Sequence, residues 1–457
     1  MRDDPSASGG TQTLDNLCDF VLATRAEDIP QPTLERAALL LLDTLGICAA
    51  AAPMEAGQIA RETAHRFFAA SSATDTAPML FDGRVASLSG AIFAAASQID
   101  NLDGHDGYNP TKGHIGVVAI PALVTLAHHR PDLSGREALT ALVLGYEVAG
   151  RAGIALHASV SDYHTSGAWN ALGVAAMAAR LRGLNNDQLR EALGIAEYHG
   201  PRSQMMREIA NPTMLHDGSG WGGLAGITAA LMAEQGFTGA PAITVEAPDA
   251  APHWADIGQF WQVDHQYIKP YPVCRWAHAA IDAAREMIDM HGVRAEDIVR
   301  VRIGSFDNAV ALYPGMPQTT SQAQYSLTFA VAAQIVHGHI GLAQISGAGL
   351  VDPAVARLVE ATDMVAEPRH EARFPEGRWA DVSFTLRDGR VIKSGDVHAR
   401  GGPERPFSSD DIRRKYKEFA GDSLGRTRAS ALAEAILALT QEGSTFADVA
   451  AHLYDPL

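Results

Sequence analysis

The sequence predicts a mainly α-helical protein, in which an all-helical domain carries an inserted, smaller α+β lid domain. Three observations lead to this prediction. Residues 30–240 are rich in Ala and Leu at helical spacing and show little strand alternation. From about residue 269 strand patterns enter, and near the C-terminus helical patterns return. We therefore assign residues 1–268 and 403–457 to the helical domain and residues 269–402 to the lid domain.

Several helices of the first half can be placed from their caps and apolar stripes. The longest apolar run, residues 37–54, is interrupted by polar residues and Pro53, and it is shorter than the roughly 20 residues of a membrane span. We predict a buried helix there. Ser134 and Glu137 have the spacing of a capping box before an apolar stripe, and Asn186 is expected to cap a second helix.

The predicted lid domain combines strands with helices. Residues 298–305 (IVRVRIGS) predict a strand, and residues 382–386 alternate apolar with polar side chains before Asp388-Gly389, which predicts a hairpin. Helices are expected at residues 323–337, 353–362 and 428–440, and in a basic segment capped by Ser408.

Composition and charge restrict the class of partner. The chain has 457 residues, of which 47% are hydrophobic and 19% charged, as in ordinary globular proteins. Lys and Arg number 36 against 53 Asp and Glu, so the formal net charge is −17 and nucleic acid is not an expected partner. An anionic substrate stays compatible with this charge, because a local cluster of Lys, Arg and His in a cleft outweighs distant, screened carboxylates.

The cysteines and the N-terminal segment bear on location. Cys18, Cys48 and Cys274 are far apart and form no CxxC pair, so neither a disulfide framework nor a structural zinc site is predicted. A reducing compartment fits this usage. The first fifteen residues lack the apolar core of a signal peptide. We therefore expect a cytoplasmic protein without a membrane partner.

The most unusual stretch is the polar loop at residues 100–116. It crowds carboxylates, imidazoles, a phenol and an ammonium around glycines, and such density is typical of functional sites. Its candidate residues are Asp100, His105, Lys112 and His114. The alternatives are a solvated loop with an Asx-turn, a calcium loop, which lacks EF-hand spacing, or a metal site through His105, Asp106 and His114.

Two further histidines precede helical runs. His164 stands just before WNALGVAAMAARL, and a helix N-terminus offers free N–H groups to a carboxylate. The alternative is a simple helix cap. His216 lies in a polar turn that follows Arg202 and Arg207, and it is a candidate substrate ligand or, alternatively, a structural histidine.

A basic cluster lies where the helical pattern gives way to the α+β pattern. Lys269, Arg275 and His278 fall within ten residues that two prolines stiffen. A site between two domains is a common arrangement for small ligands. The alternative is a surface linker with ordinary basic residues.

Taken in order, these stretches resemble the MmgE/PrpD family, which includes 2-methylcitrate dehydratase, cis-aconitate decarboxylase and iminodisuccinate epimerase. The resemblance spans nearly the whole chain. It covers RAALLLLDTLGICAAA (36–51), the polar loop ending in His114, YHTSGA (163–168), DGSGWGG (217–223), KPYPVCRWAH (269–278) and YSLTFAVAAQIVHG (325–338).

The resemblance implies a helical domain with an inserted lid, and it implies roles for individual residues. The residues that match the family's catalytic positions are Asp100, His114, His164 and Lys269. Arg275 and His278 lie in the matching hinge motif. The chain also departs from the family, because relatives often carry a Lys where it has Thr213 or His216. The polar loop is longer than in the decarboxylase, with Lys112 as an additional cation.

We therefore expect a cofactor-independent lyase, in first place a hydro-lyase, that acts on a small di- or tricarboxylate and works as a homodimer. His114 or His164 would abstract a proton next to a carboxylate, and Asp100 would orient a histidine. The cations Lys112, Lys269 and Arg275 would stabilise the anion, with His105, His216 and His278 as further ligands. An iron–sulfur cluster is disfavoured because three scattered cysteines do not supply its ligands.

The alternatives are an epimerase or isomerase that only moves the proton, a decarboxylase of a related acid, and a non-catalytic carboxylate-binding protein. The epimerase would use the same base and cations without a leaving group. The binding protein would need the basic clusters but no titrating base.

Overall fold

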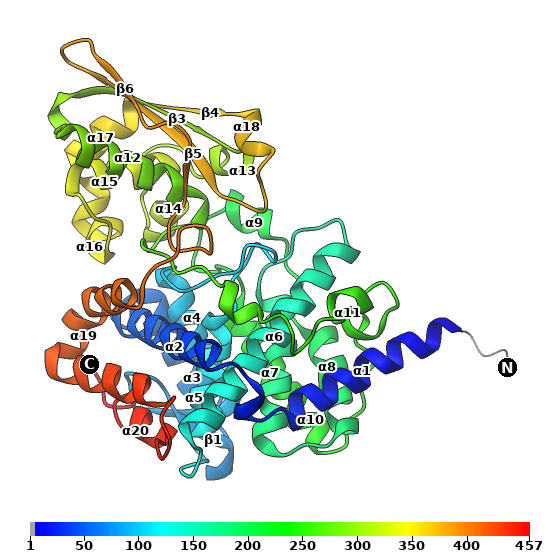
Figure 1. The fold of residues 1–457 in the computed structure, drawn as a ribbon. Helices are drawn as coiled ribbons and strands as arrows, with labels where there is room; N and C mark the ends of the chain where they lie inside the picture. The colour runs from blue at the N-terminus through cyan, green and yellow to red at the C-terminus, as the bar shows by residue number, and fades with distance from the viewer. Residues whose placement is uncertain (1–4) are drawn as a thin grey trace.

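The computed structural model describes residues 5–457, and helices dominate it. Figure 1 shows a helical body below and a smaller body with a sheet above. The mainly α-helical class is confirmed. The described part of the helical body's first segment contains α1 (Pro5–Ala23), α2 (Gln31–Ala51), α3 (Glu55–Phe67), α4 (Leu88–Leu102), α5 (Gly116–Ala127), α6 (Gly135–Ser159), α7 (Gly167–Arg182), α8 (Asn186–His199), α9 (Met205–Ala210), α10 (Ser219–Glu234) and α11 (Ile243–Glu246).

Small residues let these helices approach closely. Helix α7 packs against α6 and α10, and α10 also packs against α4 and α8. A Cβ atom at Gly222 of α10 would lie 2.5 Å from the main-chain oxygen of Gly167 in α7, so only glycine fits at this crossing. The abundance of Gly and Ala therefore reflects close helix packing.

Helix α6 is long and apolar enough by composition to cross a membrane, but 94% of its apolar window is buried inside the protein. A helix that is covered on all sides by other helices is typical of a large hydrophobic core. Ser134 caps it by accepting a hydrogen bond from the Glu137 N–H at 3.2 Å, as predicted. The Glu137 side chain pairs with Arg180 and makes no reciprocal capping contact that the structure records.

The sheet of the upper body has the strand order β4-β3-β5-β6, with β7 also paired to β5. Its strands are β3 (Ile298–Ser305), β4 (Thr362–Ala366), β5 (Trp379–Leu386), β6 (Val391–Lys393) and β7 (Val397–His398). Alternate residues of β5 are buried, and helix α12 (His278–His291) packs on that strand. The remaining helices are α13 (Asp307–Val310), α14 (Thr320–Gln324), α15 (Leu327–His337), α16 (Leu342–Ile345), α17 (Pro353–Glu360) and α18 (Pro368–Glu371).

The predicted strand at 298–305 and the predicted hairpin around Asp388-Gly389 are confirmed, whereas three local details differ. The cap of α8 is Asn185 instead of Asn186. A short hairpin, β1 (Thr76–Pro78) with β2 (Val85–Ser87), lies within the helical half. The predicted helix at 323–337 is broken after Gln324, because Ser326 caps a new helix through the Phe329 N–H.

The C-terminal helices lie in the helical body (Figure 1). Helix α19 (Ser409–Ala438), capped by Ser408 and kinked at Gly425, packs along α2, and α20 (Phe446–Ala450) follows it. Lys415 of α19 donates to the Asp43 carboxylate at 2.8 Å and to the Gly104 carbonyl at 2.6 Å. The Lys415 and Asp43 side chains are both buried. This ion pair fixes α19 on α2 and reaches the polar loop.

We expect Lys415→Met to lower the free energy of unfolding by about 3–5 kcal/mol, because it leaves the Asp43 carboxyl buried and unpaired. Urea denaturation measures this change. The double variant Asp43→Leu/Lys415→Met, which removes both charges, should recover most of the loss. A loss below about 1 kcal/mol in the single variant would show that the pair is not needed for stability.

Candidate active site

The polar loop between α4 and α5 is buried, and its main chain is tied to two other parts of the chain. Gly107 exchanges two main-chain hydrogen bonds with Tyr267, at 3.0 and 2.8 Å. Asp106 accepts hydrogen bonds from the Tyr146 hydroxyl at 3.1 Å and from the Gly116 N–H at 3.3 Å. The loop is thus a rigid part of the core and not the solvated loop that was the alternative.

Backbone strain gathers in the same region. Among the described residues, four non-glycine residues have positive φ angles, and three of them are Asp103 (55°), Lys112 (53°) and His216 (43°). Such conformations cost about 1–3 kcal/mol each and persist where the surroundings impose them.

His114 presents a free ring nitrogen. Its Nδ1 donates to the Asp106 carbonyl at 2.7 Å, so the neutral ring carries its hydrogen there and keeps a lone pair on Nε2. Nε2 lies 3.6 Å from Asp217 Oδ2. Burial lowers the pKa of His114 well below its usual value, and Lys269 lowers it further. The imidazole is therefore neutral at pH 7, with an unprotonated Nε2.

His105 stands against His114, with ring centroids 4.6 Å apart. Its side chain is fully buried, and neither ring nitrogen has a hydrogen-bond partner in the described chain. Asp100 Oδ1 lies 3.8 Å from His105 Nε2. Burial lowers the pKa of His105 well below its usual value. The predicted acidic residue Asp100 thus neighbours His105, while Asp217 neighbours His114.

Asp217 was not identified from the sequence, where Asp217-Gly218 has the pattern of a polar turn. Its Oδ2 accepts a hydrogen bond from the Ser166 hydroxyl at 2.8 Å. Burial raises the pKa of Asp217 to about 6, and it raises the pKa of Asp100 well above its usual value, with the charge of Asp217 adding to the effect. Two close, buried carboxyls do not ionise independently.

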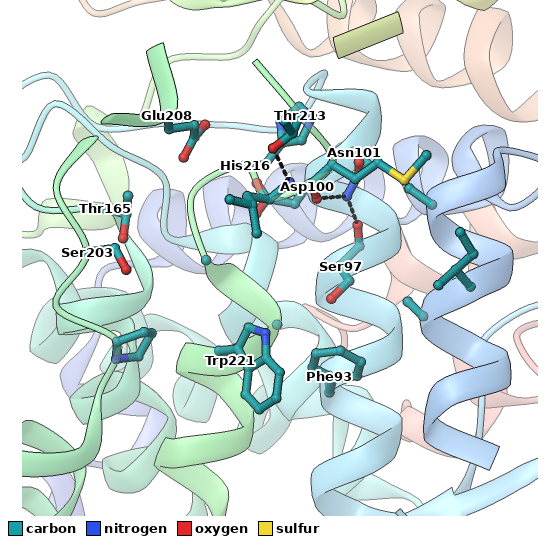
Figure 2. A pocket seen from close by; sticks show the side chains of 18 of the residues that line it. Phe93, Ser97, Asp100, Asn101, Thr165, Ser203, Glu208, Thr213, His216 and Trp221 are labelled. Atoms are coloured by element: carbon teal, nitrogen blue, oxygen red, sulfur yellow. Dashed lines mark hydrogen bonds between the residues drawn. The ribbon is translucent and has the colours of Figure 1, made fainter. Parts of the chain in front are cut away.

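A cavity of about 600 Å³ opens beside this cluster (Figure 2). Asp100 and His216 line it, together with Thr165, Glu208 and Trp221. The size is that of a small-molecule site. Burial lowers the pKa of His216 to about 3, so this second imidazole is also neutral, and its Nε2 is unpaired among the described residues. Asp217, which contacts His114, directly follows His216 in the chain.

Lys269 is fully buried and already has a partner. Its ammonium donates to the Asp103 carboxylate and, at 3.2 Å, to the Asp103 carbonyl. Burial raises the pKa of Asp103, and the charge of Lys269 opposes that shift. The alternative for this segment was a surface linker with ordinary basic residues. A fully buried Lys269 side chain rules that alternative out. Asp103 is a residue whose part in the site the sequence did not reveal.

Arg275 and His278 begin the upper body. The Arg275 guanidinium lies 4.4 Å from the centre of the Tyr267 ring and donates to the carbonyls of Arg400 at 2.7 Å and Ala399 at 3.3 Å. Burial lowers its pKa to about 10, so it stays charged at pH 7. Both nitrogens of His278 face protein atoms: Nε2 the Val273 carbonyl at 2.9 Å and Nδ1 the Arg275 guanidinium at 3.4 Å.

His164 and Lys112 form a neighbouring group around Tyr163. The Lys112 ammonium lies 4.4 Å from the centre of the Tyr163 ring, and burial beside Arg378 lowers its pKa. The His164 N–H donates to His157 Nε2 at 3.2 Å, and the His164 ring Nδ1 has no partner in the part of the chain that is described. The roles of His164 and Lys112 stay predictions.

The sequence analysis also did not identify Glu208 and Arg378 as buried residues near the site. Glu208 lies in the short helix α9, where MMREIA gave no sign of burial. Arg378 is buried next to β5 and is close enough to lower the pKa of Lys112, but the sequence offers nothing that distinguishes it from surface arginines. Only the tertiary structure reveals that these two residues are buried near the site.

Within residues 5–457, two clusters have metal-binding residue types. The ligand atoms of Asp103, His105 and His114 lie within 4.8 Å of one another, but Asp103 is neutralised by Lys269. In the upper body the cluster is His370, Asp381 and Asp396, and arginines satisfy its carboxylates: Arg302, Arg369 and Arg373. Cationic side chains thus pair with the carboxylates of both clusters.

The comparison with known proteins agrees with the geometry. The MmgE/PrpD N-terminal domain matches residues 15–251, and the MmgE/PrpD C-terminal domain matches residues 271–441. The chain is 24% identical to a cis-aconitate decarboxylase-like protein, oryM, of Aspergillus oryzae over 95% of both chains. It is 25% identical to human cis-aconitate decarboxylase over 73% of both chains, and 23% identical to that of Aspergillus terreus over 95% and 94%. The chain belongs to the MmgE/PrpD family.

Proposed function

We propose that the protein is a cofactor-independent lyase that acts on a small di- or tricarboxylate by abstracting a proton next to a carboxylate. The observation that carries this proposal is the neutral His114 ring, whose Nδ1 is fixed on the Asp106 carbonyl while Nε2 is free beside Asp217. The relatives' names support the substrate class, because cis-aconitate is a tricarboxylate. The predicted homodimer and cytoplasmic location stay predictions.

His114 is the base of the proposed reaction. The neutral imidazole would accept the proton from the substrate. Removal of this proton adds negative charge to a substrate whose carboxylates are already negative. Positive groups must stabilise it, and Lys269 and Arg275 supply this charge. Both are buried, so their interaction with an anion is stronger than in water.

Dehydration is our first candidate, in which a hydroxyl group leaves as water after proton abstraction. Decarboxylation is the second candidate, and the names of the relatives favour it. An epimerase would return the proton to the same carbon. Dehydration and epimerisation begin with the same proton abstraction at His114. Decarboxylation instead breaks a C–C bond, releases CO₂ and takes up a proton on carbon, so the group that leaves distinguishes the three reactions.

The substrate class and the reaction can be tested in one assay. We expect the protein, incubated in D₂O with citrate, 2-methylcitrate, cis-aconitate and succinate-type acids, to form or consume an alkene with at least one of them. Alkene absorbance, CO₂ release and NMR detection of deuterium in the acid separate the three reactions. Binding without alkene change, CO₂ or deuterium uptake would contradict a lyase and indicate a carboxylate-binding protein.

His114→Ala should lower kcat by about 10²-fold or more, because it removes the base. Initial rates on the acid identified above measure the effect. His164→Ala is the second variant, since the sequence leaves open which histidine is the base. His291→Ala at the end of α12 is the matched control, because this histidine is exposed and does not line the cavity. Unchanged turnover in both site variants would remove histidine catalysis from the proposal.

The substrate-binding role of Lys269 must be separated from its pairing with Asp103. Lys269→Met alone should unfold at lower urea, because it leaves Asp103 buried without its partner. Asp103→Asn/Lys269→Met removes both charges, and we expect this variant to bind a competitive polycarboxylate more weakly by about 2–5 kcal/mol. Calorimetric titration at fixed ionic strength gives the dissociation constants. Equal constants for wild type and double variant would show that Lys269 only supports the fold.

A further inference from the structure

We propose that Glu208, oriented by Tyr325, is the proton donor to the leaving hydroxyl group, so that it completes the acid–base pair with His114. This inference rests on the proposed dehydration. It assigns a catalytic role to a residue that neither the sequence pattern nor the family comparison singled out.

Tyr325 fixes the position of the acid proton. Its hydroxyl donates a hydrogen bond to Glu208 Oε1. Burial, with the nearby Glu208 charge as the next cause, raises the pKa of Tyr325 well above its usual value, so the phenol keeps its hydrogen. An oxygen that accepts the phenol hydrogen does not itself present a proton in that direction. A protonated Glu208 therefore carries its hydrogen on Oε2.

The Oε2 atom is the one that is free to act. It is buried, since Glu208 is only 5% exposed, and it has no hydrogen-bond partner among the described residues. Glu208 lines the same cavity as Asp100 and His216. Figure 2 shows Glu208 with Thr165 and Ser203 on one side of the cavity and Asp100 with Ser97 on the other. A substrate between these walls would give Oε2 its missing partner.

The surroundings favour the protonated form of Glu208. The titratable groups that face it are mainly acids: Asp217 before α10, Asp100 and Asp103 at the end of α4, and Tyr325, with Cys274 of the hinge also near. The buried ammonium of Lys269 is held by Asp103, and Arg207 is exposed at the cavity wall. Burial first and Asp217 second raise the pKa of Glu208 well above its usual value.

A purely structural role does not explain this arrangement. A glutamate that only anchored Tyr325 would use one oxygen and bury the other without a partner, which costs about 1–3 kcal/mol. Natural proteins retain such a loss chiefly where a site needs the free group. In the proposed reaction, the cavity would need a hydrogen-bond donor for the hydroxyl group of the substrate, and Glu208 Oε2 would supply it.

The proton balance of the reaction is closed by this pair. His114 Nε2 removes the proton next to the carboxylate, and the electron pair of that C–H bond forms the new C=C bond. The C–O bond to the hydroxyl breaks, and Glu208 Oε2 gives its proton to the departing oxygen, which leaves as water. The enzyme then holds protonated His114 and ionised Glu208, and a proton passed from His114 to solvent and from solvent to Glu208 restores both.

Glu208→Gln keeps the shape and the contact with Tyr325 but has no acid proton to give. On the hydroxy acid that wild type dehydrates, kcat should fall about 10²-fold. On the analogue with fluorine in place of the leaving hydroxyl, which departs as fluoride without a proton, kcat should change by less than about threefold. Because Glu208 must be protonated to act, the wild-type rate on the hydroxy acid should fall as pH rises through its raised pKa. This alkaline limb should be absent when wild type acts on the fluoro analogue, which needs no proton from Glu208.

Each other outcome overturns part of the account. Equal rates of wild type and Glu208→Gln on the hydroxy acid would remove Glu208 while leaving the lyase intact. Equal losses on both substrates would show that Glu208 only supports the fold. Wild-type protein that releases no water from any acid of the panel would remove the dehydration, and this inference with it.

The protonation of Glu208 can be measured without substrate. The infrared carbonyl stretch of a protonated carboxyl is distinct from that of a carboxylate, so the spectrum of wild type minus Glu208→Gln at pH 7 should contain the protonated band. Glu442→Gln is the matched control, because Glu442 is exposed and should contribute only a carboxylate band. A carboxylate band for Glu208 would overturn the inference even if the variant is slow.

Discussion

The site depends on the burial of the polar loop that connects α4 to α5. A buried loop must find partners for its polar groups, since unpaired ones cost about 1–3 kcal/mol each. Two ammonium groups supply much of this pairing from distant segments: Lys269 holds Asp103, and Lys415 holds Asp43 and the Gly104 carbonyl. Lys269 and the C-terminal helix α19 therefore both hold the loop that carries His105 and His114.

The same burial sets the protonation states of the site. Desolvation disfavours every charge, so the histidines His105, His114 and His216 are neutral and the carboxyls Asp100 and Glu208 tend to be protonated. Burial thus favours the neutral form of the histidines and the protonated form of the carboxyls, and it is the common physical cause of these shifts. In the proposed reaction, Arg275 and Lys269 would supply the positive charge for an anionic substrate.

The inserted upper body begins and ends at one place, which is why it contributes to the site. The Ile268 N–H donates to the Gly401 carbonyl at 2.9 Å, and Arg275 bonds to the carbonyls of Ala399 and Arg400. The entering and leaving chain segments are therefore fastened side by side beside Tyr267, which pairs with the polar loop. The break between α14 and α15 likewise places Tyr325 against Glu208. The neighbouring Gln324 donates to the Asn101 carbonyl of α4 at 2.9 Å, so this region is also tied to the helical body.

The sequence by itself determined the mainly helical class, the strand at 298–305, the hairpin before residue 391 and the importance of the polar loop. These features depend on local periodicity, turn residues and the density of titratable groups, all of which are readable along the chain. Only the tertiary structure decided that Asp217 neighbours His114, that Asp103 forms an ion pair with Lys269, and that Glu208 lines the cavity. The physical reason is that burial and pairing join residues more than 100 positions apart, and no local pattern records the distance between two side chains.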